Sequence, residues 1–91
     1  MKTAQIDVDL IAKFEDVQLG GGFERLLPDF MRQMRYTANQ RAFDVGGAVR
    51  TTAQPELVVK EGQSPFQGFV FMLSTRWIVD VPDDAEIPTE R

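Results

Sequence analysis

The sequence predicts an α+β domain in which one or two N-terminal helices pack on a small antiparallel sheet of about three strands. Two patterns predict it: apolar residues at helical spacing from residue 23 to about 39, and apolar residues at every second position from 69 to 81. Ninety-one residues can bury one hydrophobic core but not two. We therefore expect a single domain over residues 1–82 and a flexible acidic tail over residues 83–91.

The first element, within residues 5–17, fits two periodicities. From Ile6 to Leu10 apolar residues alternate with polar ones, as in a strand. Ile6, Leu10 and Phe14 also recur at helical spacing, and an aspartate at the start could cap a helix. We favour a short helix over about residues 9–17.

Three consecutive glycines, residues 20–22, should end that helix, because glycine loses much backbone entropy inside a regular element. Backbone N–H groups at the start of a following helix could hold a phosphate. A phosphate loop needs a lysine followed by serine or threonine there, however, and Glu24 occupies that place. We interpret the glycines as a linker between helices.

The second helix, from Phe23 to about Asn39, is amphipathic, since its apolar residues cover an arc of about 140° at 100° per residue. Polar residues lie on its opposite side, among them Arg25, Arg32 and Tyr36. The apolar stripe consists of Phe23, Leu26, Leu27, Phe30, Met31, Met34 and Ala38.

Strands are expected after residue 41. Alternating apolar residues over 43–51 predict one strand, which two glycines at 46 and 47 interrupt as a bulge or bend. Leu57–Val59 predicts a second strand, and residues 61–65 a loop.

The last strand, residues 69–81, should turn its apolar row toward the core. Its other face is half apolar, through Val70, Met72 and Ile78, and such a face favours a covering layer. Thirteen extended residues would reach about 43 Å at ~3.3 Å each, whereas a compact domain of this size is about 31 Å across. The strand therefore bends, or it projects and meets another copy. The inward row consists of Phe69, Phe71, Leu73, Thr75, Trp77, Val79 and Val81.

Composition argues against an enzyme. The chain contains no cysteine and no histidine, which removes thiolate chemistry, disulfides, the usual general base and the usual metal ligand. We therefore expect no cofactor and no metal. No apolar run is long enough to span a bilayer and no secretion signal is visible, so we expect a cytoplasmic protein without a membrane partner.

Charge is distributed unevenly. Residues 25–50 carry five arginines and two acids, or +3, whereas residues 80–91 carry five acids and one arginine, or −4. The net charge of −4 is not typical of a duplex-binding protein.

The expected order is a short N-terminal helix, a Leu-Gly-Gly-Gly-Phe junction, an amphipathic helix, and strands that end in Val-Pro before an acidic tail. This order resembles a loose family of short, uncharacterised tailed-phage accessory proteins. The matching elements are Leu19 to Leu27, Gly46-Gly47 and Val79-Asp80-Val81-Pro82, although the strand-like segment from Leu57 to Val59 is an addition to the pattern. The resemblance implies a phage or prophage accessory protein, acting in the host cytoplasm, and supplies no site residues.

We expect a non-enzymatic protein-binding module that docks onto a host or viral protein, for example to inhibit a host factor, and that forms a homo-oligomer. The alternative is a protein that binds nucleotides or single-stranded nucleic acid through arginine and aromatic side chains, which the acidic balance disfavours. A carboxylate-based enzyme is a weaker third candidate. The predicted partner-binding residues are Arg25, Arg32, Tyr36, Val70, Met72 and Ile78.

Overall fold

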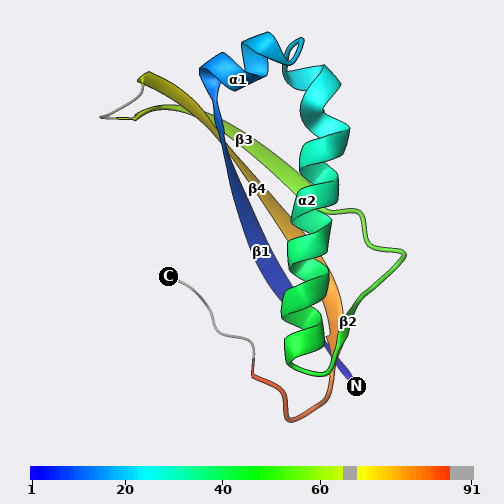
Figure 1. Cartoon of the computed structure of the whole chain (residues 1–91). Helices are drawn as coiled ribbons and strands as arrows, with labels where there is room; N and C mark the ends of the chain where they lie inside the picture. Colours follow the sequence, from blue (N-terminus) through cyan, green and yellow to red (C-terminus); the bar gives the residue numbers. More distant parts are fainter. Residues whose placement is uncertain (65–67, 87–91) are drawn as a thin grey trace.

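A computed structural model describes residues 1–64 and 68–86 of the chain. Within them, two helices precede most of a four-stranded antiparallel sheet, and the longer helix lies along one face of that sheet (Figure 1). The predicted α+β fold is confirmed, with one strand more than expected. The elements are β1 (Lys2–Lys13), α1 (Phe14–Leu19), α2 (Phe23–Asp44), β2 (Ala48–Val49), β3 (Glu56–Ser64) and β4 (Gly68–Val81).

Strand β4 is the centre of the sheet. On one side it pairs with the whole of β1, from Val81 opposite Lys2 to Val70 opposite Lys13. On the other side it pairs first with β3 and then, near its end, with the short β2. Strands β1 and β3 are therefore the long outer strands of the described sheet.

The core lies between α2 and one face of the sheet. Met34, Ala38 and Ala42 of α2 are buried at one-turn intervals. Two of these are alanines, which let the helix axis approach the strands closely. They join one apolar cluster with Leu73 and Trp77 of β4. The predicted amphipathic helix is confirmed, and it continues five residues beyond Asn39, to Asp44.

The helix expected over residues 9–17 is wrong for most of its length. Residues 2–13 form strand β1, and only Phe14–Leu19 are helical. Both periodicities were present in the sequence, but only the strand lets Ile6 and Val8 enter the core while every residue from Lys2 to Lys13 pairs with β4. The three glycines do join α1 to α2, as predicted, and the Gly22 N–H donates to the Val17 carbonyl at 2.8 Å.

The strand expected over residues 43–51 is reduced to two residues, because α2 runs on to Asp44. Gly46 ends the helix with a φ of 81°, a conformation that suits glycine. The Gly46 and Gly47 N–H groups donate to the carbonyls of Phe43 and Ala42 at 2.9 and 2.8 Å. The two glycines are thus a helix end rather than a strand bulge.

Strand β3 is longer than predicted. It contains Leu57–Val59, as expected, but it continues to Ser64. The loop predicted over residues 61–65 is wrong for Glu61 to Ser64, since each of these pairs with a residue of β4 between Gly68 and Phe71. Residue 65 lies outside the described residues.

The long strand at residues 69–81 is confirmed as β4, and its inward row is buried from Leu73 to Val81. At the other end the prediction fails, because Phe69 is largely exposed. There the sheet extends past α2, and the phenyl rings of Phe69 and Phe71 lie 6.1 and 6.0 Å from that of Phe14, the first residue of α1.

The length of β4 is accommodated by an elongated molecule. The principal extents are 43, 26 and 17 Å, so the estimate of a domain 31 Å across was too small. Strand β1, strand β4 and helix α2 all lie roughly along the long axis of the molecule (Figure 1). The strand does not bend sharply, and its start extends past α2 together with the end of β3 (Figure 1).

The predicted acidic tail starts within the described part. Residues 82–85 form a turn in which the Ala85 N–H donates to the Pro82 carbonyl at 2.9 Å, and Ala85 packs against the core. Residues 87–91 of the predicted tail lie outside the described residues.

Candidate functional site

The face of the sheet opposite α2 is the main candidate surface. Among the described residues no helix or strand covers it, and we call it the open face. Its apolar side chains are substantially exposed: Ile11 at 65%, Met72 at 41% and Ile78 at 37%. Val58 is also exposed, and Val70 is half-buried. Three strands therefore present apolar side chains to one side of the molecule.

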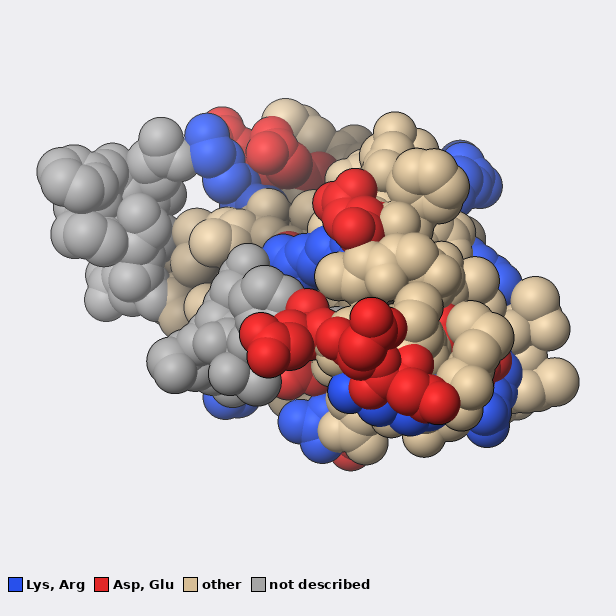
Figure 2. All heavy atoms as spheres, turned by 90° about the horizontal axis from the view of Figure 1, so that it is seen from below, with Lys and Arg blue, Asp and Glu red and all other residues tan. Residues whose placement is uncertain are grey.

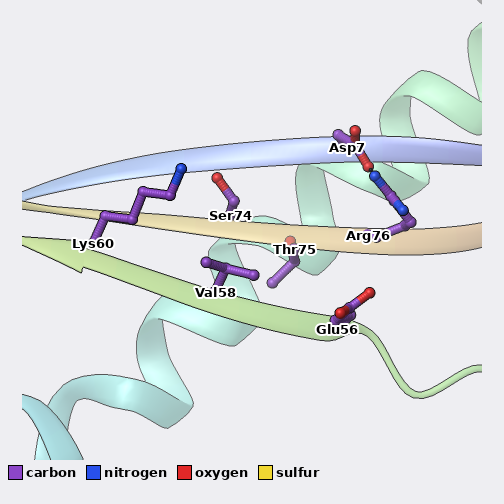
Figure 3. Close-up of a pocket in the computed structure, with 7 residues that line it drawn as sticks. All are labelled: Asp7, Glu56, Val58, Lys60, Ser74, Thr75 and Arg76. Atoms are coloured by element: carbon purple, nitrogen blue, oxygen red, sulfur yellow. Dashed lines mark hydrogen bonds and ion pairs between the residues drawn. The ribbon is translucent and has the colours of Figure 1, made fainter.

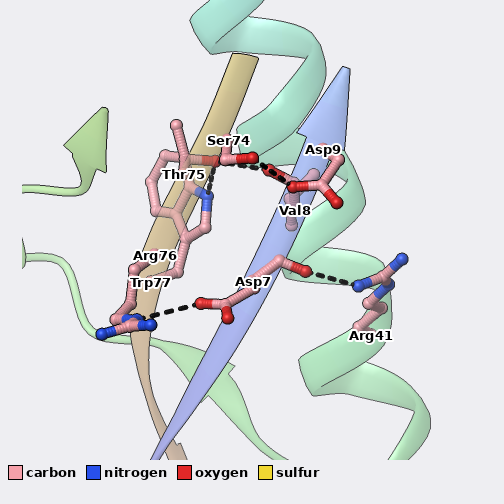
Figure 4. A network of polar contacts seen from close by, with 8 residues as sticks. All are labelled: Asp7, Val8, Asp9, Arg41, Ser74, Thr75, Arg76 and Trp77. Atoms are coloured by element: carbon pink, nitrogen blue, oxygen red, sulfur yellow. Dashed lines mark hydrogen bonds and ion pairs between the residues drawn. The ribbon is translucent and has the colours of Figure 1, made fainter. Parts of the chain in front are cut away.

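Polar contacts between neighbouring segments cross the open face in rows. Arg76 of β4 contacts Asp7 of β1, with 3.0 Å between Nε and Oδ1. One row along, the Ser74 hydroxyl donates to Oδ1 of Asp9 at 2.6 Å (Figure 4). Near the end of β4, Arg50 forms an ion pair with Asp80, with 2.9 Å between Nη2 and Oδ1. These rows fix the orientation of charged groups around the apolar ones.

Arg76 lies between two acids, since Asp7 on β1 and Glu56 on β3 are both its pairing partners. The hydrogen bond to Asp7 raises the pKa of the Arg76 guanidinium, as does the charge of that carboxylate, and the charge of Glu56 adds to this. For the same reasons Asp80 raises the pKa of Arg50. Both guanidinium groups therefore stay charged at every pH at which the protein is folded.

A shallow groove of about 220 Å³ lies over these rows (Figure 3). It has both charged and apolar walls and is open to solvent, which suits a protein surface better than an enclosed small molecule. Among the described residues no cluster of three or more carboxylates is placed to hold a metal ion. The groove is lined by Asp7, Glu56, Val58, Lys60, Ser74, Thr75 and Arg76.

The outer side of α2 is a second, separate surface. Arg25, Arg32 and Tyr36 lie there, each about half a helical turn from the buried Met34. Arg32 forms an ion pair with Asp29 at 3.3 Å, and the Gln40 side-chain amide donates to the Tyr36 hydroxyl at 3.3 Å.

The structure therefore divides the six predicted partner-binding residues into two groups of three. Val70, Met72 and Ile78 lie on the open face, whereas the three residues of α2 lie on the far side of the helix. The helix and the sheet separate the groups, so one flat partner surface cannot contact both.

Sequence reasoning missed two apolar members of the open face, Ile11 and Val58. Ile11 was placed in the expected helix, although the alternation from Ile6 onward carried a signal for a strand. Val58 was assigned to a strand, but nothing in the sequence showed which side of the sheet it would occupy. Its pairing with Ser74 decides that.

The outer edge of β1 is partly occupied. The Arg41 guanidinium of α2 donates to the backbone carbonyl of Asp7 at 2.7 Å (Figure 4). The next carbonyl, that of Val8, faces β4 and accepts a hydrogen bond from the Thr75 hydroxyl at 3.3 Å. Because the groups of successive residues alternate between the two sides of a strand, the Asp7 carbonyl points away from β4. A bound arginine at mid-strand hinders the addition of another strand at this edge.

The end of the molecule at which β4 finishes is acidic. Seen from that end, Asp and Glu side chains gather near the centre of the surface (Figure 2). Asp83, Asp84 and Glu86 are exposed there, and Asp83 lies 3.3 Å from the amino group of Met1. This surface lies at the opposite end from the aromatic contacts of Phe14.

No protein-family model, curated protein or solved structure matches this chain. None of the helices in the described part is both long enough and apolar enough to cross a bilayer.

Proposed function

We propose that this protein is a small non-enzymatic protein-binding module that forms a homo-oligomer through the open face. The observation that carries the proposal is the exposure of Ile11, Met72 and Ile78 on one face of a sheet whose other face α2 covers. Protein–protein interfaces combine buried apolar side chains with direct hydrogen bonds. The polar rows between the apolar side chains supply directional contacts as well as area.

Self-association is tested by the mass of the protein in solution. We expect light scattering at micromolar concentration to give a mass above the 10.3 kDa of one chain. Ile78→Glu places a charge in the interface and should raise the dissociation constant at least tenfold, because burying an unpaired carboxylate is costly. Tyr36→Glu is the matched control, since it adds the same charge on the far side of α2.

A wild-type protein that stays at 10.3 kDa throughout would remove the self-association part of the proposal. Dissociation by Tyr36→Glu but not by Ile78→Glu would move the interface to the helix. Circular dichroism of each variant verifies that the fold is retained.

The wider role that we propose is that of a phage-encoded accessory protein acting in the host cytoplasm on a host or viral protein, for example by inhibiting a host factor. Its support is the sequence resemblance, in which a glycine linker precedes an amphipathic helix and strands end at Val81-Pro82. This wider role does not depend on the open face.

The alternative, binding of single-stranded nucleic acid, is favoured by one observation: Arg25, Arg32 and Tyr36 share the outer side of α2. Arg32 is already paired with Asp29, and the chain is acidic. We therefore expect no change in the fluorescence anisotropy of a labelled 20-nucleotide DNA at low salt. Salt-sensitive binding that Arg25→Glu abolishes would replace the leading proposal by the alternative.

A further inference from the structure

We propose that the occupant of the open face is a second copy of this chain, packed face to face about a two-fold axis. The axis lies midway between the two sheets, runs across the strands at right angles to β4, and passes over Ser74. The inference rests on the proposed function and specifies its interface. Two sheets that pack face to face keep their strands nearly aligned, about 10 Å apart. A closed dimer with one shared surface is the commonest form of oligomer.

The strand register determines what such an axis brings together. Ser74 pairs with Asp9 on β1 and with Val58 on β3, so these three residues form the central row of the open face. Rotation about the axis places residues at equal distances on either side of that row opposite each other. Each off-axis contact then occurs twice in the dimer.

Part of the apolar surface matches under this rotation, whereas Ile11 faces the partner's Asp7. Val70 faces the partner's Ile78, four residues away from the axis in each strand. Val58 lies beside the axis and faces the partner's Val58. Val58 and Ile78 are exposed in the single chain and Val70 is half-buried, so these contacts remove apolar surface from water.

One pair of opposite charges also matches. Lys60 and Glu56 lie on the same strand at equal distances on either side of Val58, so Lys60 faces the partner's Glu56. Arg76 faces the partner's Met72, and its own charge is already paired with Asp7 at 3.0 Å. Asp9 approaches the partner's Asp9, but it lies on the outer strand β1 and accepts a hydrogen bond from Ser74.

The axis over Ser74 brings one pair of like charges together, the two Asp9 residues, and three other axes are less favourable. An axis over Arg76 would set Arg76, Asp7 and Glu56 each against its own copy. An axis parallel to the strands and above β4 would again oppose the two Arg76 residues and would place Asp7 against the partner's Glu56. An axis over Met72 would also bring one pair of like charges together, the two Lys60 residues, and it would leave the part of β4 beyond Arg76 without a counterpart in the partner. Like charges brought together in an interface disfavour it.

Pairing through the edge of β1 is also less favourable, because Arg41 occupies the Asp7 carbonyl at 2.7 Å. The outer edge of β3 is the competing site for strand addition, and charge exchange and cross-linking distinguish it from the open face.

Charge exchange tests the Lys60–Glu56 contact. We expect Lys60→Glu and Glu56→Lys each to raise the dimer dissociation constant about tenfold or more, because each change creates two like-charge contacts. The double variant K60E/E56K should restore the constant to within about threefold of wild type. Sedimentation equilibrium measures all four proteins, and circular dichroism verifies their folds.

Cross-linking tests the position of the axis. The chain has no cysteine, so Val58→Cys introduces its single thiol. A bismaleimide about 8 Å long should join two V58C chains, since facing sheets are about 10 Å apart. Arg32→Cys, on the far side of α2, is the control and should remain uncoupled at the same concentration.

The outcomes separate the inference from the proposed function. Charge rescue together with selective coupling of V58C supports the axis over Ser74. An oligomer that shows neither rescue nor coupling overturns this axis. The proposed function then stands if Ile78→Glu dissociates that oligomer, whereas an oligomer that resists Ile78→Glu points to the β3 edge and overturns the open face as the interface. A monomeric wild-type protein overturns both.

Discussion

Replacing Trp77 by alanine is expected to lower the free energy of unfolding by about 3–5 kcal/mol, the range for truncating a buried aromatic side chain. Trp77 is only 2% exposed and lies on β4, the central strand of the described sheet. Its indole N–H donates to Oγ1 of Thr75 at 2.7 Å, and the Arg35 guanidinium lies 6.0 Å from its ring. The truncation therefore leaves a cavity and a buried hydroxyl that has lost one of its partners.

Urea denaturation followed by circular dichroism measures this loss, because Trp77 is the sole tryptophan and its fluorescence disappears with it. Tyr36→Ala is the matched control: it truncates an aromatic side chain that is 66% exposed. We expect its effect to stay below about 1 kcal/mol, as is usual for surface substitutions. Equal losses in the two variants would contradict the packing described for β4.

Gly47→Ala is expected to destabilise the fold by about 3 kcal/mol or more, at the upper end for overpacking. A Cβ at this position would overlap the carbonyl oxygen of Asp80 and lie 2.7 Å from Cγ1 of Val81. The obstacle is mainly the backbone of β4, which is held by its pairing with Lys2 and Thr3 of β1 and cannot easily move.

The control is Gly62→Ala, because a Cβ there would have no neighbour within 4 Å. Alanine loses less backbone entropy than glycine, so we expect this variant to be unchanged or slightly more stable. Thermal unfolding should separate the two variants by about 12 °C or more, at roughly 4–8 °C per kcal/mol for a domain of this size. A normal melting temperature for Gly47→Ala would show that β2 and β4 are farther apart than described.

Periodicity predicted the elements that have only one favourable face. Residues 69–81 alternate over a full strand, and α2 has an apolar stripe of fixed width, so each could bury its apolar side in one way only. Residues 6–17 satisfied two periods at once. That ambiguity was resolved by β4, which offers β1 a complete set of backbone partners that a helix would leave unused.

The candidate site was predictable only in part. Val70, Met72 and Ile78 follow from the alternation of a single strand. Ile11 and Val58 belong to the same surface only because β1 and β3 pair with β4 in a particular register. A shift of one residue in either pairing would have turned these side chains to the other face.

By itself the sequence determined helix α2, the long strand β4 and the α+β class, since these depend on local periodicity. Its composition determined the absence of cysteine and histidine chemistry. Only the tertiary structure decided that residues 2–13 form a strand, that α2 covers one face alone and that acids from two strands flank Arg76. The reason is physical: backbone hydrogen bonds between strands distant in the chain set the register, and the register decides which side chains share a surface.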